Sequence, residues 1–563
     1  MKKMTRAISI LLCLIMLAGC IPFTSVAEGE TSPFTDVPVD SWCYKFVSWA
    51  YEKGYIAGRG NGIFDPSTPI TRAEYVGILS CIAGIDKNDY TGEAFTDVVP
   101  GRDWYAPAVK WATENEIIAG VGNGEFMPEL KITRQELCVM TIKYIEKVEK
   151  LYTPIYKEYD EFEDDGDISK YARESVKLMR QCDMIAGTVD GTFEPLGSAT
   201  RAEASVILFR MCEMIEKLTT PKDRVITLYF DTRINSLSSA PNEDMKNADI
   251  ILCTVGELRQ DGSIQNYNEY TLANQVRGFK AKFPDAKVLM TMYGAFENST
   301  YNEDACARFA DSIMNIMNKT GLDGVDIDWE YPNEITVQYH TNLIMALRNR
   351  FDKESESTGK HYYVTISSAF GEWALTKSEL EKIHIYLDYI NLMTYDIKSD
   401  KNITFHHTAP CDTSVNKWYT YASLEANLKL LLSKHIPQEK ILGGVGFNAR
   451  RWRFVEDPEN NGGLGVATPE GGGYYTADLA SIERLAEVGL YEEYFDEEAQ
   501  ASYLYGKAGK EFISFESRRS CAAKCDLVRK YNIGGLMIFT YHLCPNCGVL
   551  TEIRDNLDGK PTK

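Results

Sequence analysis

The stretch Leu322-Asp323-Gly324-Val325-Asp326-Ile327-Asp328-Trp329-Glu330-Tyr331-Pro332 places acidic residues at alternate positions in an otherwise apolar run. Successive side chains of a β-strand point to opposite faces, so Asp326, Asp328 and Glu330 would share one face. The Val, Ile and Trp between them favour a regular strand, whereas calcium-binding loops prefer irregular backbone with Gly and Asn. The pattern therefore predicts a strand with a row of carboxylates, rather than a solvated edge strand or a calcium loop.

Such a row must serve a purpose if the strand lies in a core. Burying a carboxylate costs free energy unless the group is paired or takes up a proton. Crowding three carboxylates should raise the pKa of at least one of them. A raised pKa keeps a general acid protonated near neutral pH, so we expect a catalytic acid in this stretch.

The whole chain has the size and composition of a multidomain globular protein. It has 563 residues, 44% of them hydrophobic and 11% aromatic, so we expect two or more domains with substantial cores. The formal net charge is −21. An acidic protein repels a phosphate backbone, so nucleic acid is not expected as a partner.

Three copies of one sequence unit precede the acidic stretch, with a period of about 60 to 67 residues. Each copy has an Ile-Ala-Gly turn, a Phe-x-Pro segment and a Thr-Arg-x-Glu segment. Self-similarity of this kind marks stacked copies of one structural unit, here two helices around a glycine-rich turn. We therefore predict an all-α array with repeats at residues 33–90, 91–154 and 155–218.

The Thr-Arg-x-Glu segments have a structural and a functional aspect. Thr caps the second helix of each copy, and Glu three residues later completes a capping box. An arginine directly after the cap opposes the helix dipole, so its recurrence indicates an anionic ligand. The recurring arginines are Arg72, Arg134 and Arg201.

The three copies resemble surface-layer homology (SLH) domains, whose triplets bind pyruvylated secondary cell-wall polysaccharide. The third copy lacks the tryptophan of the other two and has Tyr171 nearby. The resemblance implies a wall-associated protein on the surface of a bacterium. The residues that it implies for polysaccharide binding are Trp42, Arg72, Trp104, Arg134 and Arg201.

Residues 1–27 have the basic start, apolar stretch and small residues of a secretory signal peptide. The apolar stretch is short for a membrane-spanning helix. Leu17-Ala18-Gly19-Cys20 resembles a bacterial lipoprotein cleavage box, whereas Ser25-Val26-Ala27 fits an ordinary cleavage site. The ordinary site is favoured because a wall-anchoring module would make a lipid redundant, and we predict an exported protein.

Residues 222–563 alternate apolar, strand-like runs with amphipathic helical segments. This alternation predicts a (β/α)8 TIM barrel, in which catalytic residues lie at the carboxyl ends of the strands. The eight predicted strands are 225–230, 249–255, 287–292, 324–330, 362–367, 389–394, 441–447 and 534–539.

The Asp-x-x-Asp-x-Asp-x-Glu pattern that ends at Glu330 resembles the signature of glycoside hydrolase family 18, the chitinase-like enzymes. Met393-Thr394-Tyr395-Asp396 matches a second element of that family, Met-x-Tyr-Asp, at the end of the sixth predicted strand. The resemblance implies substrate-assisted retaining catalysis, an exception to the rule of two catalytic carboxylates. It implies no cofactor and no metal.

In that mechanism, Glu330 protonates the glycosidic oxygen while the 2-acetamido oxygen of the sugar attacks C1. Asp328 orients the acetamido N–H, Asp326 shares a proton with Asp328, and the Tyr395 hydroxyl donates to the acetamido oxygen. Asp323 is a structural member of the motif. The residues expected to bind the sugar are Tyr229, Tyr293, Gly294, Met393, Asp396, Arg450 and Phe539.

Three segments depart from the family pattern. Tyr293 stands in the segment where the family has Ser-x-Gly-Gly, and Arg450 is kept in a motif that has lost its tyrosine. Phe539 stands where the family has tryptophan, and it offers a smaller apolar platform. The segment 452–515, rich in Gly, Tyr and Glu, is expected to form an inserted wall of the cleft.

The predicted activity is hydrolysis of β-1,4 bonds after N-acetylglucosamine in chitin oligomers or chitin-like glycans. An endo-β-N-acetylglucosaminidase that acts on peptidoglycan or N-glycans is the alternative within this class. A non-catalytic chitinase-like lectin is the alternative outside it, although such relatives commonly lose the acid that Glu330 provides here.

The chain has 14 cysteines, mostly at irregular spacing. Cys521 and Cys525 lie one helical turn apart, and Cys544-Pro-Asn-Cys547 follows the last predicted strand. Zinc, disulfides and buried thiols all remain open for this set, and the spacing favours disulfides or thiols over zinc.

Overall fold

The computed structural model describes residues 31–240, 242–260, 263–265, 268–397, 401–417 and 420–560. The predicted leader and both candidate cleavage sites lie outside these residues. The chain divides into two compact units between Thr220 and Pro221, and each is described by itself. Within the described residues, no helix combines the length and apolar character needed to cross a membrane.

The first unit contains the three predicted repeats, each with two helices. The second helix of each repeat begins directly after Thr71, Thr133 or Thr200, and each of these residues forms the predicted capping box. The helices are α2(Tyr44–Glu52), α3(Arg72–Ile82), α4(Ala106–Glu114), α5(Arg134–Lys147), α6(Arg173–Gln181) and α7(Arg201–Thr219).

The three repeats close into a ring. The second helix of each repeat packs on the first helix of the next, as α3 on α4, α5 on α6 and α7 on α2. At the centre, the backbone N–H of Ile70 donates to Ala199, that of Ala199 to Ile132 and that of Ile132 to Ile70, at 2.9 to 3.0 Å. Each repeat therefore depends on both of the others.

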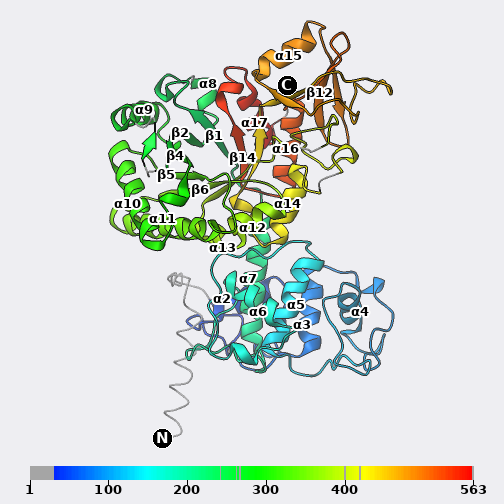
Figure 1. Ribbon diagram of the computed structural model, residues 1–563. Helices are drawn as coiled ribbons and strands as arrows, with labels where there is room; N and C mark the ends of the chain where they lie inside the picture. The colour runs from blue at the N-terminus through cyan, green and yellow to red at the C-terminus, as the bar shows by residue number, and fades with distance from the viewer. Residues whose placement is uncertain are drawn as a thin grey trace. The chain divides into compact units, whose positions relative to one another are not determined.

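The second unit is the predicted (β/α)8 barrel, with all eight predicted strands present (Figure 1). Parallel pairing runs through the strands in chain order, and β1 pairs with both β2 and β14, which closes the barrel. The strands are β1(Val225–Asp231), β2(Ile250–Leu258), β4(Lys287–Gly294), β5(Gly324–Asp328), β6(Tyr363–Ser368), β7(Tyr389–Leu392), β8(Ile441–Gly446) and β14(Gly535–Phe539).

β5 is shorter than predicted. The last paired residue is Asp328, opposite Tyr293 of β4, so Glu330 lies in the loop beyond the strand. Figure 1 shows α9, α10 and α11 on the outer side of the strands. The main outer helices are α9(Glu269–Lys282), α10(Glu303–Thr320), α11(Val337–Thr358), α14(Leu424–Ser433), α16(Arg518–Lys530) and α17(Val549–Leu557).

An antiparallel sheet is inserted between β8 and α16, in the predicted wall segment. Its strand order is β10-β9-β13-β12-β11, and Trp452, Tyr503 and Phe512 lie in its buried core. Its elements are β9(Ala449–Trp452), β10(Gly473–Tyr475), α15(Leu479–Glu487), β11(Glu492–Asp496), β12(Ala501–Gly506) and β13(Glu511–Ser514).

A fully buried ion pair joins this inserted sheet to the barrel. Lys524 of α16 donates to Glu516, which follows β13, at 2.5 Å, and both side chains are 0% exposed. The same ammonium donates to Thr408 at 2.9 Å and to the Gly444 carbonyl of β8 at 2.8 Å. All three ammonium protons thus have acceptors, as a buried cation requires.

We expect Lys524→Met to destabilise the second unit by about 3–5 kcal/mol, because it leaves the Glu516 carboxylate buried and unpaired. Urea unfolding would measure the loss, and hydrogen exchange of β8 would locate it. The double variant with Glu516→Gln should recover part of the loss. A change below about 1 kcal/mol, the scale of a surface ion pair, would contradict this account.

Candidate active site

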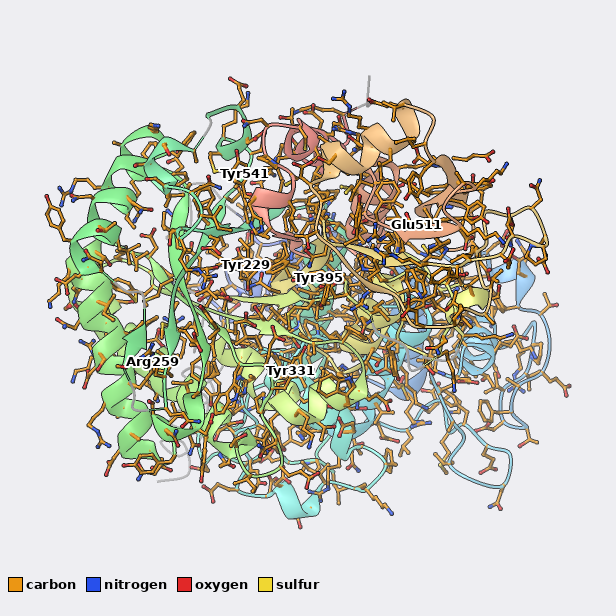
Figure 2. All side chains as sticks on the ribbon, turned by 45° about the horizontal axis from the view of Figure 1, so that its top comes forward. Tyr229, Arg259, Tyr331, Tyr395, Glu511 and Tyr541 are labelled. Atoms are coloured by element: carbon orange, nitrogen blue, oxygen red, sulfur yellow. The ribbon has the colours of Figure 1, made fainter. Side chains whose placement is uncertain are left out.

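A cavity of about 690 Å³ opens at the carboxyl ends of the barrel strands. Seven of the predicted site residues line it: Tyr229, Asp328, Glu330, Met393, Tyr395, Asp396 and Phe539. Figure 2 labels Tyr229 and Tyr395, which come from β1 and the loop after β7, together with Tyr331 from the loop after β5. The structure therefore brings both sequence motifs to one site.

Asp326 lies beneath the cavity and is 0% exposed. One of its oxygens accepts from Thr365 at 2.6 Å and Asn391 at 3.1 Å, and the other from Tyr229 at 2.8 Å and Thr291 at 3.3 Å. Burial raises the pKa of Asp326 more than these hydrogen bonds lower it. The donors come from β6, β7, β1 and β4, so this carboxyl ties four strands together.

Asp328 sits between Asp326 and Glu330 on the same face. Burial first, and then the charges of Glu330 and Asp326, hold the pKa of Asp328 well above its ordinary value, against a hydrogen bond from Ser367. The predicted effect of crowding thus falls on Asp328, whereas burial raises the pKa of Asp326.

The buried Oδ1 atom of Asp328 has no hydrogen-bond partner among the described residues. Both oxygens of Asp326 accept from other side chains. The proton that Asp326 is predicted to share with Asp328 stays a prediction. The open oxygen of Asp328 is available to a ligand.

Aromatic side chains form the floor of the cavity. The rings of Tyr395 and Phe539 are stacked, with centroids 5.5 Å apart and planes at 14°, and Tyr229 meets Phe539 edge-on at 5.5 Å. The contact of the Tyr395 hydroxyl within the protein is a weak one, to the Met537 sulfur at 3.8 Å. This hydroxyl can therefore donate to a bound sugar.

Asp396 completes this side of the cavity. It accepts from Asn448 at 2.9 Å and from the Tyr474 hydroxyl at 3.4 Å. Asn448 lies at the start of the inserted segment and Tyr474 in β10. Asp396 thus connects the barrel to the inserted sheet at the edge of the cavity.

Three predicted sugar-binding residues are not among those that line the cavity. Tyr293 accepts a hydrogen bond from Arg233 at 2.7 Å on the rim. Gly294 has φ 112°, and a Cβ there would lie 2.4 Å from the Leu258 carbonyl oxygen. This close approach explains the glycine without a ligand.

The third, Arg450, lies behind the wall of the cavity. It is buried, donates to the Gly472 carbonyl at 3.1 Å, and holds its guanidinium 4.7 Å from the centroid of the Tyr474 ring. The side chain therefore supports Tyr474 by a cation–π contact.

Several lining residues were not predicted from the sequence. The exposed aromatic side chains are Tyr331, Trp373 and Tyr474, at 45%, 42% and 60% exposure. Tyr331 and Trp373 meet edge to face at 5.1 Å. Tyr331 lies in a loop, Trp373 in the short helix α12(Glu372–Ser378) and Tyr474 in β10, and no periodic pattern marks these side chains as facing the site.

In the first unit, the recurring arginines join neighbouring repeats. Arg72 donates to the carbonyls of Phe126 and Ala119, at 2.9 and 3.1 Å. Arg134 donates to Phe193, and Arg201 to Phe64 and Ala57, in the same way. This contact gives the recurrence a structural cause beside the predicted anionic ligand. Trp104 is 62% exposed, and Trp42 is partly buried against the core.

The C-terminal cysteines are free thiols in the structure. Burial raises the pKa of Cys525 to about 12. Within the described residues, no group of three or more His, Cys, Asp or Glu side chains is arranged to hold a metal ion. The zinc alternative has no support in this arrangement, which fits buried thiols.

A closed parallel barrel with Asp328 and Glu330 in a cavity at the carboxyl ends of its strands has the architecture of a (β/α)8 enzyme. The chain belongs to glycosyl hydrolases family 18, whose family model matches residues 225–543. The S-layer homology domain model matches residues 33–76, 94–138 and 161–205. The chain therefore joins a chitinase-like glycosidase domain of family 18 to three S-layer homology domains.

Chitinase A1 of Niallia circulans is 27% identical over 294 residues, which cover 47% of this chain and 42% of that relative. A solved family 18 N-acetylglucosaminidase from Paenibacillus barengoltzii is 28% identical with a TM-score of 0.53, over 60% of this chain and 100% of that chain. Chitinase ChiW from a Paenibacillus species, described as a cell-surface-expressed multi-modular enzyme, is 27% identical with a TM-score of 0.51. The match covers 59% of this chain and 42% of that chain. The chain thus spans less than half of Chitinase A1.

The raised pKa of Asp328 predicts a pH-dependent gain in stability for Asp328→Asn. Between the ordinary value of about 3.9 and the raised value, the folded protein holds a proton that the unfolded chain releases, so wild-type stability falls as pH rises. The Tm of the variant should therefore exceed that of wild type by a margin that grows as the pH rises above about 4.

Asp323→Asn is the matched control. Burial raises the pKa of Asp323, but Lys280 at 2.7 Å and Lys360 at 3.0 Å lower it by more. The pKa of Asp323 therefore lies below its ordinary value. The ionised Asp323 carboxylate stabilises the folded protein at pH values above its ordinary pKa. Asp323→Asn should therefore be less stable than wild type throughout the same pH range. A margin for Asp328→Asn that does not change with pH would contradict the assignment.

Proposed function

We propose that the protein is a wall-anchored glycosidase that cleaves β-1,4 bonds after N-acetylglucosamine in chitin-like glycans by substrate-assisted retaining catalysis. The observation that carries the proposal is that Glu330 and Asp328 line the same cavity and that Oδ1 of Asp328 has no hydrogen-bond partner among the described residues. An acid and an acceptor beside each other are what this chemistry requires.

In the first step, Glu330 gives its proton to the glycosidic oxygen as the bond to C1 breaks. The acetamido oxygen of the same sugar attacks C1 and forms an oxazolinium ion, so that no protein nucleophile is needed. The open oxygen of Asp328 accepts the acetamido N–H, and the Tyr395 hydroxyl donates to the acetamido oxygen. Water then attacks C1 with Glu330 as the base, which restores the original configuration.

Aromatic side chains would hold the glycan on both sides of this centre. Phe539 provides the floor for the reacting sugar, and Tyr331, Trp373 and Tyr474 offer exposed rings along the walls. Sugar rings pack their apolar faces on such rings while their hydroxyls stay hydrated. The cavity therefore suits a polymer with several N-acetylhexosamine units.

An endo-β-N-acetylglucosaminidase that acts on peptidoglycan or N-glycans is the second candidate. The similarity to a solved N-acetylglucosaminidase over the whole of that chain supports it. The lectin alternative has less support, because Glu330 and the row beneath it are intact. The SLH repeats would bind secondary cell-wall polysaccharide and hold the enzyme at the wall.

Glu330→Gln should lower the hydrolysis rate by about 10²- to 10⁴-fold, the usual contribution of a general acid, without loss of thermal stability. The assay measures product release from chitin oligosaccharides, peptidoglycan and a high-mannose N-glycan. The substrate that wild type cleaves and the variant does not identifies the glycan. Oligosaccharide binding by wild type without turnover on any of them would favour the lectin.

Tyr395→Phe should lower kcat by about 10²-fold, on the scale of losing one preorganised donor. Its Tm should change little, because the hydroxyl contacts only a sulfur atom within the described protein. Tyr363→Phe, in β6 and outside the cavity lining, is the control and should retain full activity. Equal activity of both variants would remove Tyr395 from the mechanism.

A further inference from the structure

The cavity at the mouth of the barrel is asymmetric. Its lining residues lie at or just after the ends of β1, β5, β6, β7, β8 and β14, in α12 and in the inserted sheet. Among the described residues, none that lines it comes from β2, from β4 or from the loops that follow these two strands. The cavity therefore extends from the middle of the barrel to one side only.

On the other side, the loop after β1 crosses the end of β2. Arg233 donates to the two oxygens of Asp231 at 2.9 and 2.7 Å, and to the Tyr293 hydroxyl of β4 at 2.7 Å. The Thr232 hydroxyl donates to the Thr254 carbonyl of β2 at 3.0 Å. Because β2 lies between β1 and β4 in the barrel, Asp231, Arg233 and Tyr293 span the end of β2. We call these three residues the Arg233 bridge.

The alternation of side chains places the Arg233 bridge at the level of the reacting centre. Thr291 of β4 donates to Asp326 inside the barrel. Tyr293 is two positions further along β4, so it lies on the same inner face, one layer nearer the mouth. It stands opposite Asp328 in the register of β4 and β5. The same alternation along β1 places Asp231 on the inner face, two positions after the tyrosine that also donates to Asp326.

The ion pair at the base of the bridge fixes the direction of Arg233. Burial raises the pKa of Asp231, but the hydrogen bonds and the charge of Arg233 lower it by more, so the carboxyl is ionised. A bidentate pair of this kind holds the planar guanidinium group in one orientation. The N–H group that remains on the far side of Arg233 is then directed at the Tyr293 hydroxyl. The bridge is therefore a fixed part of the rim.

The chemistry decides which end of a glycan faces the bridge. Under the proposed function, Glu330 protonates the oxygen that leaves C1, so the leaving part of the glycan lies on the side of Glu330 and Trp373. C1 and C4 are at opposite ends of a sugar ring. The 4-hydroxyl of the reacting sugar therefore points away from Glu330, across Phe539 and Tyr229, whose rings are in contact. On that side of the barrel mouth stands the Arg233 bridge.

We propose that the Arg233 bridge ends the binding cleft beyond one sugar, so that the enzyme removes single N-acetylhexosamine units from the non-reducing ends of its glycan. Arg233 and Tyr293 are the specificity-determining residues. The leaving part of the glycan extends along the exposed rings of Tyr331 and Trp373. This inference rests on the proposed function and adds to it the end of the glycan that is attacked and the size of the product.

Product analysis with three probes tests the inference. They are a chitin pentasaccharide, the same pentasaccharide with a galactose on its non-reducing 4-hydroxyl, and 4-nitrophenyl N-acetyl-β-glucosaminide. Wild type should release the monosaccharide as the first product of the uncapped pentasaccharide, and 4-nitrophenol from the aryl glycoside, whose single sugar fills the closed end. The galactose cap should lower the rate at least about 100-fold, the scale of a steric clash in a packed site.

The double variant Arg233→Ala/Tyr293→Gly removes the bridge. The rate on the capped pentasaccharide, divided by the rate on the uncapped one, should rise at least about tenfold, because the clash is relieved. This ratio is insensitive to a general loss of activity. Arg350→Ala is the matched control, since Arg350 of α11 also bonds two carboxylate oxygens, of Asp311 at 2.7 Å and Glu354 at 2.9 Å. It should keep the wild-type ratio.

Tyr293→Phe keeps the ring and its packing and loses only the hydroxyl that accepts from Arg233. The same ratio should rise about threefold, on the scale of one hydrogen bond. This variant tests the bridge even if the double variant does not fold.

The outcomes separate this inference from the proposed function. If wild type cleaves the capped and uncapped pentasaccharides equally well, or first releases a disaccharide or a longer product, the inference is wrong and the proposed function stands. The same holds if wild type cleaves peptidoglycan or the N-glycan but not the aryl glycoside. An equal ratio for wild type, Tyr293→Phe and the double variant would remove the bridge from the account. If wild type cleaves none of these substrates, the proposed function fails as well.

Discussion

The catalytic unit depends on one buried carboxyl, Asp326, and the four hydrogen bonds that it accepts. Its donors come from four strands, so the barrel must be closed for this carboxyl to keep all its hydrogen bonds. A carboxyl at 0% exposure is tolerated only with such compensation. Burial, and then the neighbouring carboxyl groups of Glu330 and Asp326, raise the pKa of Asp328. The barrel thus sets the electrostatic environment of a residue that the proposed chemistry uses.

The inserted sheet is attached to the barrel by polar contacts at two depths. The ion pair of Lys524 and Glu516 secures it beneath the surface, and Asp396 contacts Asn448 and Tyr474 at the cavity. Arg450 supports Tyr474 from behind. A wall held in this way can present an aromatic ring to a substrate without the entropic cost of ordering a free loop. Polar contacts also join the repeats of the first unit, where Arg72, Arg134 and Arg201 donate to backbone carbonyls of neighbouring repeats.

The sequence predicted the eight strands and the acidic row well, because side chains alternate along a strand and the apolar runs are long. It also predicted the capping boxes, which depend on residues three positions apart. It could not predict the partners of Arg72, Arg134 and Arg201, since these lie in other repeats. Nor could it show that Arg450 lies behind the cavity or that Trp373 and Tyr474 line it, because a short helix and an inserted sheet leave no periodic signal that marks the side chains facing the cavity. The strand that carries the acid ends at Asp328 rather than at Glu330, where its pairing with β4 stops.

The central claim is that the substrate, and not the protein, supplies the nucleophile. Proton NMR of the first product released from a chitin oligosaccharide, recorded before mutarotation, tests it most directly. The account predicts the β-anomer from an N-acetylated substrate and no cleavage when the reacting sugar carries a free amine in place of the acetamido group. Release of the α-anomer, or unchanged cleavage of the de-acetylated sugar, would contradict it.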